Sequence, residues 1–249
     1  MSIRMVGLRK SFGTKRVLDG LSLEVPDGSV TTIIGGSGSG KSTALKLVIG
    51  LIRPDDGEVW VDGVRVDTLE GDDLYEMRRK IGFVFQFAAL FDSMTIGDNV
   101  AMGLRRAGKL DEPAIRDRVR ESLELVDLEG VEDRFPSELS GGMKKRAGVA
   151  RAVAQRPRYL LYDEPTTGLD PITVTVIDRL ILRMRDELGV TSLVITHDMD
   201  SAYRVSDRIA MLHEGRVRWE GTPDEIQAAD DAAVQGFIRG EPELWESAS

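Results

Sequence analysis

The sequence predicts an α/β fold with a mainly parallel sheet, an antiparallel β-rich start and a helical insertion. Three observations support this prediction. Short apolar strands alternate with helical segments in the second half of the chain. The first 32 residues hold two alternating segments around a turn, as in a hairpin. Residues 87–157 carry helical patterns and little strand signal, which indicates a helical lobe inserted between two strands of the sheet.

The whole-chain composition excludes several classes of protein. The 249 residues are enough for one large α/β domain or two small ones. No cysteine is present, which rules out disulfides, a thiol nucleophile and cysteine-ligated metals. Acidic residues outnumber basic ones by 42 to 33, which argues against a nucleic-acid surface. No apolar run approaches the length of about 20 residues that spans a bilayer, so we expect any membrane role to require a partner.

Alternation, helical spacing and turn residues locate the elements in chain order. Expected strands of the first half are 3–11, 17–25, 30–34, 58–61 and 81–86, with helices after residue 42 and over 74–80. The second half is expected to hold helices over 112–127, 140–155 and 172–188, strands 159–162 and 192–196, a hairpin of 209–212 with 216–220, and a helix from residue 222. His213 falls in the turn of that hairpin, where we expect a structural or solvated role. The acidic tail, 236–249, is a candidate for disorder.

A glycine-rich loop follows the strand at 30–34. Residues 33–45 read IIGGSGSGKSTAL and fit G-x-x-x-x-G-K-[ST], with a strand before the loop and a helix after it. Backbone N–H groups must approach phosphate closely, which requires glycine at 36, 38 and 40. The helix N-terminus favours the same anion. Lys41 is placed to reach the β- and γ-phosphates and Ser42 to bind Mg²⁺. The alternatives are an ordinary glycine turn and a dinucleotide fingerprint; the latter fails because Lys41 stands at its third glycine.

Two further motifs carry related chemistry. Residues 159–164, YLLYDE, form an apolar strand that ends in two acids. Asp163 is suited to hold Mg²⁺ and Glu164 to activate water, unless both are merely solvated at a strand end. At 139–142, LSGG opens a helix with Ser140, Gly141 and Gly142, which is either a second anion site or an ordinary N-cap. Two anion sites for one nucleotide suggest that each nucleotide lies between two subunits.

These motifs carry a family resemblance. Together with Gln86, TTGLDP at 166–171 and ITHD at 195–198, they occur in an order that resembles an ABC transporter ATPase subunit, to about residue 240. The resemblance implies a P-loop NTPase with a RecA-like parallel sheet core, an N-terminal antiparallel β subdomain and an inserted α-helical subdomain. It implies one ABC ATPase domain over 1–240, with core and β subdomain in 1–86 and 158–225, the helical subdomain in 87–157, and a C-terminal helix and acidic tail in 226–249.

The resemblance also implies site roles, with ATP and Mg²⁺ bound. Glu164, His197 and Gln86 are the expected catalytic residues, and Ser42, Gln86 and Asp163 the expected Mg²⁺ ligands. Expected ATP contacts are Phe12 against adenine, the phosphate loop (Gly35, Gly36, Ser37, Gly38, Ser39, Gly40, Lys41, Ser42, Thr43), Ser140, Gly141 and Gly142 from the opposite subunit, and Asp170 in the loop that crosses between subunits. ATP-bound subunits are therefore expected to form a homodimer.

Met143 at the end of the signature, and FAALFDSMTIGDNVAMGLR after Gln86, are similar to the Mla/MCE-type phospholipid transporter ATPases (MlaF-like). In that family the ATPase lies peripherally on the cytoplasmic face of the inner membrane. Its partners are an integral membrane permease (MlaE-like), a substrate-binding MCE-domain protein and often a small STAS-domain protein. Phe87 departs from the small polar residue common there. Phe87, Leu90, Phe91 and Met94 form either ordinary core or a groove for a permease helix.

The resulting functional prediction is an ATPase that energises phospholipid transport through a separate permease. The alternative within the class is another importer or exporter, for example of amino acids or peptides. A soluble non-transport ABC ATPase is disfavoured because the stretch between phosphate loop and signature is too short for a long coiled coil. A small-molecule kinase has no use for LSGG, and a non-hydrolysing scaffold has no use for Glu164 and His197.

Overall fold

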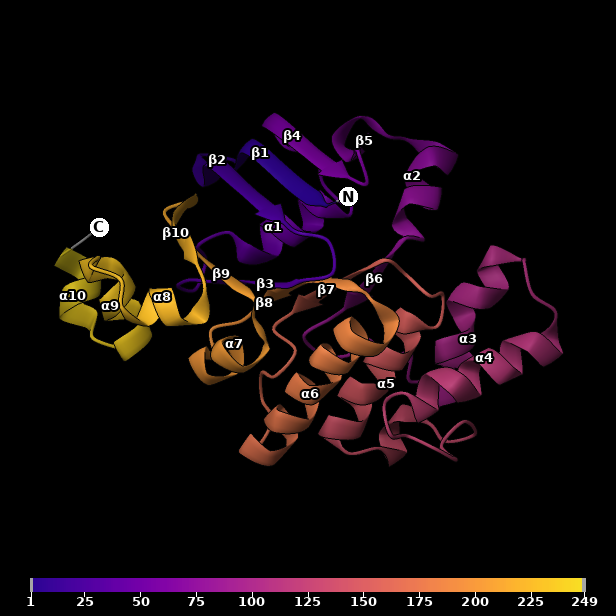
Figure 1. Cartoon of the computed structure of the whole chain (residues 1–249). Helices are drawn as coiled ribbons and strands as arrows, with labels where there is room; N and C mark the ends of the chain where they lie inside the picture. The colour runs from indigo at the N-terminus through magenta and orange to yellow at the C-terminus, as the bar shows by residue number, and fades with distance from the viewer. Residues whose placement is uncertain (1, 248–249) are drawn as a thin grey trace.

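Two sheets and a lobe of helices make up the molecule (Figure 1). The computed structural model describes residues 2–247, so residues 248 and 249 of the expected acidic tail lie outside the described part. An antiparallel four-stranded sheet has the order β2-β1-β4-β5. A six-stranded sheet has the order β10-β9-β3-β8-β7-β6, with β10 antiparallel to β9 and the other pairs parallel. The predicted fold class is therefore confirmed.

Most elements lie close to the ranges that the sequence predicts. The strands are β1 (Ile3–Phe12), β2 (Lys15–Val25), β3 (Val30–Ile34), β4 (Asp56–Val61), β5 (Val64–Arg65), β6 (Ile81–Val84), β7 (Tyr159–Asp163), β8 (Thr191–Ile195), β9 (Arg208–His213) and β10 (Arg216–Gly221). The helices are α1 (Lys41–Val48), α2 (Gly71–Arg78), α3 (Ile96–Ala107), α4 (Glu112–Glu124), α5 (Gly141–Val153), α6 (Pro171–Leu188), α7 (Met199–Val205), α8 (Pro223–Gln227), α9 (Ala232–Arg239) and α10 (Pro242–Ser247).

The parallel sheet is buried on both faces, as its continuous apolar strands require. In β7, Leu160 and Tyr162 pack into the core shared with the helical lobe. Tyr159 and Leu161 point the other way, into the core shared with the four-stranded sheet and α1. Because successive strand residues face opposite sides, one short strand stabilises both layers. This double burial fixes the position of the strand end, where Asp163 lies.

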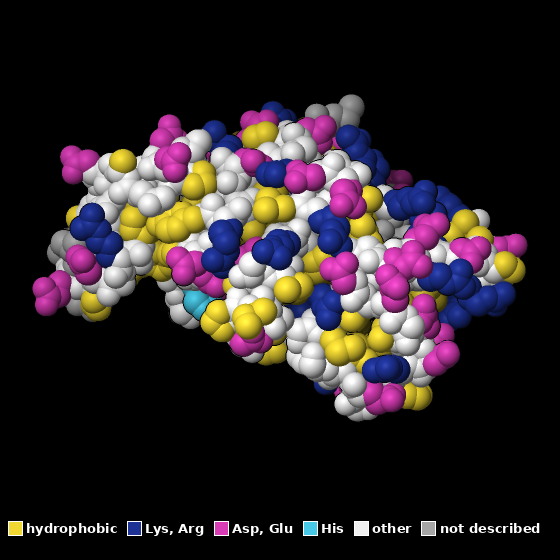
Figure 2. Space-filling model, turned by 60° about the horizontal axis from the view of Figure 1, so that its bottom comes forward, with side chains coloured by type: hydrophobic (Ala, Val, Ile, Leu, Met, Phe, Trp, Pro, Cys, Tyr) yellow, Lys and Arg dark blue, Asp and Glu magenta, His cyan; other side chains and the backbone are white. Residues whose placement is uncertain are grey.

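The helical lobe is built from α3, α4 and α5, and it extends to one end of the molecule in Figure 1. Each helix begins at a side-chain cap: Thr95 accepts from Asp98 N, Asp111 from Ala114 N and Ser140 from Met143 N. Helix α4 ends at Glu124, three residues before the predicted boundary at 127. On the face shown in Figure 2, acidic and basic side chains are interspersed among separate hydrophobic patches.

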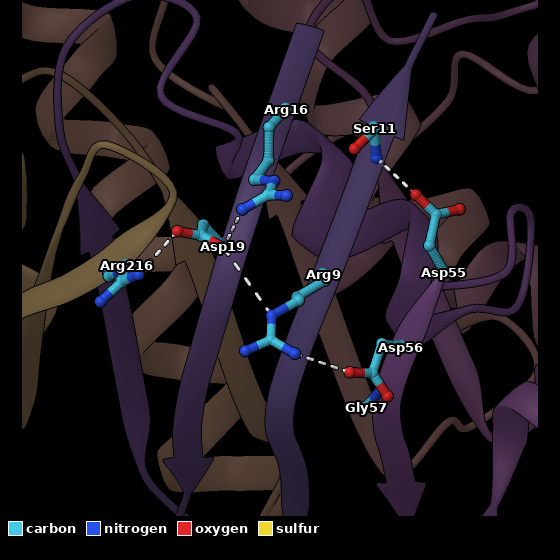
Figure 3. A network of polar contacts seen from close by, with 8 residues as sticks. All are labelled: Arg9, Ser11, Arg16, Asp19, Asp55, Asp56, Gly57 and Arg216. Carbon is cyan, nitrogen blue, oxygen red and sulfur yellow. Dashed lines mark hydrogen bonds and ion pairs between the residues drawn. The ribbon is translucent and has the colours of Figure 1, made fainter. Parts of the chain in front are cut away.

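A network of ion pairs joins the two sheets and extends across β2, β1 and β4 (Figure 3). Arg216 in β10 donates to Asp19 in β2 at 2.6 Å, and Arg16 donates to the same carboxylate at 3.0 Å. Arg9 in β1 lies 3.7 Å from Asp19 and donates to Asp56 in β4 at 2.8 Å. The hydrogen bond from Arg216, with a smaller contribution from Arg16, holds the pKa of Asp19 below its usual value. The network therefore links the hairpin of the core sheet to three strands of the antiparallel sheet.

The C-terminal segment differs from the sequence prediction. Residues 236–247 do not form a disordered tail; they complete α9 and form α10. The physical reason is apolar burial, because Phe237 and Trp245 pack against the cluster formed by β9, α7 and α8. His213 is also not in a surface turn. It is the last residue of β9 and is buried, and its ring lies edge-on to Trp245 with centroids 4.5 Å apart.

Candidate active site

A cavity of about 690 Å³ opens at the edge of the parallel sheet where β3, β7 and β8 end. Polar groups at the carboxyl ends of parallel strands converge there, as in other open α/β sheets. The cavity is lined by Phe12, Lys15, Val17, Gly35, Gly36, Ser37, Gly38, Gly40, Lys41, Ser42, Thr43, Gln86, Glu164, His197 and Phe237. Most of the residues that the sequence places around one nucleotide are thus brought together.

The phosphate loop has a backbone that only glycine can supply at two points. Gly35 has a φ of 147°, and a Cβ on it would lie 2.2 Å from the carbonyl oxygen of Leu212. Gly40 caps α1 with a φ of 107°. Lys41 Nζ donates to the carbonyl oxygens of Gly35 and Gly36 at 2.8 and 3.1 Å. Burial lowers the pKa of Lys41, and the nearby carboxylates of Glu164 and Asp163 partly oppose this shift. The loop therefore presents one buried cation and the N-terminus of α1 to the cavity.

The candidate Mg²⁺ ligands are oxygen groups placed side by side. Ser42 Oγ donates to Asp163 Oδ1 at 2.9 Å, which brings the start of α1 to the end of β7. Gln86 lines the same cavity from the loop after β6. A hydroxyl, a carboxylate and an amide oxygen form a hard donor set, which suits Mg²⁺ shared with phosphate and water. Among residues 2–247, no three His, Cys, Asp or Glu side chains form a metal cage by themselves.

Glu164 is held by groups from two loops. Its Oε2 lies 2.8 Å from His197 Nδ1, and Thr167 Oγ1 donates to the same oxygen at 3.2 Å. The backbone of Glu164 has a φ of 51°, which costs energy in a residue other than glycine. Its N–H is fixed by the carbonyl of Ile195 at the end of β8. The arrangement directs a largely buried carboxylate and an exposed imidazole toward the cavity.

Ser39 of the phosphate loop is absent from the described lining of this cavity, and so are the four expected ATP contacts outside that loop: Ser140, Gly141, Gly142 and Asp170. These four lie together elsewhere. Asp170 caps α6 and accepts a hydrogen bond from the Thr173 hydroxyl. A Cβ on Gly142 would lie 2.6 Å from Thr173 Cγ2, so the two helix starts touch. Ser140, Gly141 and Asp170 are exposed, so the surface around them, which is the candidate second anion site, is open to another molecule.

The end of the cavity at Phe12, where adenine is expected, includes side chains that the sequence reasoning missed. Phe12, expected there, is 52% exposed. Phe237 of α9 lines the same cavity. Behind the loop, Trp245 of α10 lies so close that a Cβ on Gly36 would be 3.3 Å from Trp245 Cζ2. The sequence did hold a signal that this tail is ordered, because Phe237 and Trp245 lie in it and disordered segments are poor in aromatic residues.

Comparisons with known proteins agree with this geometry. A family model described as ABC transporter matches residues 18–167. The chain is 41% identical over 240 residues to Mkl of Mycobacterium tuberculosis, named for ribonucleotide transport, covering 96% of this chain and 67% of that protein. It is 41% identical over 229 residues to the intermembrane phospholipid transport ATP-binding protein MlaF of Haemophilus influenzae, covering 92% and 87%.

A solved structure shows the same fold in a nucleotide-bound state. The dimeric post-hydrolysis ATP-binding cassette MJ0796, bound to ADP and phosphate, matches with a TM-score of 0.81 and 34% identity, over 89% of this chain and 98% of that one. Within residues 2–247, no helix has the length and apolar character needed to cross a membrane. The chain belongs to the ABC transporter family and is an ATP-binding, ATP-hydrolysing component of it.

Proposed function

We propose that this chain is the ATPase subunit of a transporter that moves phospholipid between membranes through a separate permease. The observation that carries the proposal is the similarity to MlaF, which extends over 92% of this chain and 87% of that protein. Met143 and the stretch after Gln86 support the same subfamily. The name of Mkl favours a second candidate, the transport of ribonucleotides. Other solutes, including amino acids and peptides, remain the wider alternative.

In the proposed mechanism the loop and Lys41 bind the phosphates, and Phe12 stacks on adenine. Ser42 and Asp163, with Gln86, would hold Mg²⁺, which when bound would neutralise charge that develops on the phosphates. Glu164 accepts a proton from a water whose oxygen forms the new bond to the γ-phosphorus. The bond from γ-phosphorus to the β–γ bridging oxygen breaks, and ADP keeps that oxygen. His197 orients the Glu164 carboxylate through the 2.8 Å contact and would contact the γ-phosphate.

The second anion-binding surface supports a dimer with shared sites. Ser140, Gly141 and Gly142 lie away from the chain's own cavity, so a head-to-tail partner would present them to the nucleotide. Asp170, beside them, would lie in the loop that crosses between subunits. The solved relative that binds ADP and phosphate is dimeric. We therefore assign the ATP-bound state to a homodimer with two composite sites.

An apolar groove beside Gln86 is the proposed docking site for the permease. A cavity of about 420 Å³ is lined by Phe83, Phe85, Ala89, Phe91, Met102 and Arg151, among others. Phe87, next to it, is 83% exposed. Such a groove fits an amphipathic helix that inserts apolar side chains. Docking there would place the subunit peripherally on the cytoplasmic face of the inner membrane, under an MlaE-like permease, with an MCE-domain protein and a STAS-domain protein as further partners.

The hydrolytic role of Glu164 is tested by Glu164→Gln. We expect ATP affinity to be retained and kcat to fall by about 10²- to 10⁴-fold, because the amide accepts no proton. Steady-state phosphate release and equilibrium nucleotide binding measure the two effects. The closed dimer should accumulate with ATP in size-exclusion chromatography. Lys41→Ala serves as the contrasting variant and should lose nucleotide affinity. Normal turnover by Glu164→Gln would remove this residue from the mechanism.

The cargo is tested on the complex isolated from host membranes through this subunit. Co-purification of a permease with an MCE-domain or STAS-domain protein supports phospholipid transport. In proteoliposomes, ATPase activity of that complex should respond to phospholipid composition and not to added ribonucleotides. A solute-binding protein of the amino-acid type in the complex, or stimulation by ribonucleotides alone, would contradict the proposal.

A further inference from the structure

One face of α5 holds the loop that follows β6. Lys145 Nζ donates to the main-chain carbonyl of Gln86. Two turns further along, Arg151 donates to the carbonyls of Ala88 and Ala89 at 2.8 and 2.6 Å. Between them lies Gly148, where a Cβ would come within 3.3 Å of Ala88 Cα. Positions 145, 148 and 151 are three residues apart and so share a side of the helix.

The loop needs these contacts because its backbone is strained. Ala88 and Ala89 have φ values of 58° and 50°, a region that residues other than glycine rarely occupy. Such a turn leaves carbonyl groups without strand or helix partners, and Lys145 and Arg151 supply the donors. Burial lowers the pKa of Lys145 and of Arg151. A cation buried to this extent costs free energy unless it is hydrogen-bonded. The hydrogen bond to the Gln86 carbonyl therefore offsets part of the cost of burying Lys145.

The same helix begins at the surface assigned to a second subunit. Ser140 caps α5, and Gly141 and Gly142 form its first turn. Lys145 follows one turn later, and only 7% of its surface is exposed. Resting on the dimer of the proposed function, this geometry makes α5 a direct connection between two nucleotides. Its first turn faces the partner's γ-phosphate, and its next turn holds Gln86 in the chain's own cavity.

We propose that Lys145 is a positioning residue for Gln86. Its ammonium group anchors the Gln86 main chain to α5, so the position of the Gln86 side chain relative to the sites that Mg²⁺ and the attacking water would occupy follows the position of α5 on the partner's nucleotide. Hydrolysis in one site then depends on occupancy of the other. Glu164 is the nearby opposite charge, and a direct effect of the lysine on that carboxylate is the rival explanation. Hydrogen bonding and charge can be separated by substitution.

The test compares Lys145→Met, which removes donor and charge, with Lys145→Gln, which removes the charge and keeps an N–H donor on a side chain one bond shorter. For Lys145→Met we expect kcat to fall by about 10- to 100-fold, the size of effect that misplacement of a catalytic group produces. Its KM for ATP should stay within about threefold, because the phosphate loop is untouched, and the dependence of rate on ATP should lose cooperativity. Lys145→Gln should keep most of the activity. Lys144→Met, which removes the same charge from the neighbouring position, is the matched control.

Dimer formation distinguishes positioning from damage to α5. In the Glu164→Gln background, Lys145→Met should still give an ATP-dependent closed dimer in size-exclusion chromatography. The proposal is overturned if Lys145→Met has wild-type kcat, if Lys145→Gln is as slow as Lys145→Met, or if the closed dimer is lost. If Lys145→Met does not fold, the comparison of Lys145→Gln with Lys144→Met decides. Failure of the unmutated protein to bind or hydrolyse ATP would instead contradict the proposed function itself.

Discussion

At the scale of single residues, Asn99 shows how one buried amide organises a loop. Its Oδ1 accepts from the N–H of Phe91 at 2.7 Å, and its Nδ2 lies 3.1, 3.2 and 2.9 Å from the carbonyls of Phe91, Met94 and Thr95. The side chain is fully buried. These bonds satisfy the main chain that runs from the docking groove into α3. A buried polar network of this kind is favourable only while it is complete.

Asn99→Ala should therefore destabilise the protein strongly. The N–H of Phe91 and the carbonyl of Met94 would lose their partner, whereas the carbonyls of Phe91 and Thr95 keep backbone N–H partners. Each unsatisfied buried group costs about 1–3 kcal/mol. Allowing for partial relaxation, we expect a loss of about 2–4 kcal/mol in the free energy of unfolding, measured by urea denaturation. The control is Asp98→Ala, at the position next to Asn99, which removes an exposed ion pair with Arg105. This substitution should cost less than about 1 kcal/mol. Equal effects of the two variants would contradict this role for Asn99.

At the scale of elements, the C-terminal helices pack against the phosphate loop. Trp245 of α10 meets Gly36, and its ring contacts Phe237 of α9 at a centroid distance of 5.4 Å and His213 of β9 at 4.5 Å. Edge-to-face and tilted aromatic pairs of this kind add to the stability gained by burial. The loop, a strand end and two helices therefore share one aromatic cluster, although they are far apart in the sequence.

Removal of residues 242–249 should weaken both stability and nucleotide binding. Trp245 is partly buried, and full burial of a large apolar side chain contributes about 1.5–3 kcal/mol. Without α10 the phosphate loop would be less ordered before binding, so ordering it on the phosphates would cost more conformational entropy. We expect a lower Tm in calorimetry and a few-fold weaker ATP affinity. In the full chain, Trp245→Phe keeps an aromatic ring in the cluster and should retain most of both. A truncated chain with unchanged Tm would show that α10 contributes nothing to the fold.

At the scale of the whole molecule, the proposed docking groove has exposed aromatic side chains around it. Within residues 2–247, Phe85, Phe87 and Phe91 stay exposed. Apolar exposure of this kind beside a groove is typical of an interaction surface. Because Phe87 is exposed, its replacement should change contact with a partner and leave the stability of the subunit intact.

Phe87→Asp tests this separation. We expect Tm to change little, since surface substitutions usually stay within about 0.5 kcal/mol, and co-purification with the permease to be lost, because a carboxylate would be buried without a partner. Pull-down from host membranes measures the second effect. Leu51→Asp is the matched control, at an exposed apolar position outside the groove. Undiminished permease recovery with Phe87→Asp would place docking elsewhere.

How much the sequence predicts depends on what fixes each feature. The positions of most strands and the phosphate loop follow local rules, since glycine spacing and strand alternation appear in the chain itself. Lys145 and Asn99 were missed because their partners are main-chain carbonyls, which leave no residue pattern. Helices α9 and α10 were missed because burial against distant strands overcame a composition that suggests disorder. The placement of Ser140 and Asp170 away from the cavity agrees with the expectation of a shared site.

The contact between Gly36 and Trp245 also constrains how this sequence can change over generations. A methyl group at position 36 would meet the indole at 3.3 Å, closer than side chains normally pack. A lineage that gains a side chain in the phosphate loop must therefore shift or shrink the aromatic residue near its C-terminus, or lose that packing. The two ends of the gene are expected to vary together at these positions, and among relatives a larger residue at one should accompany a smaller residue at the other.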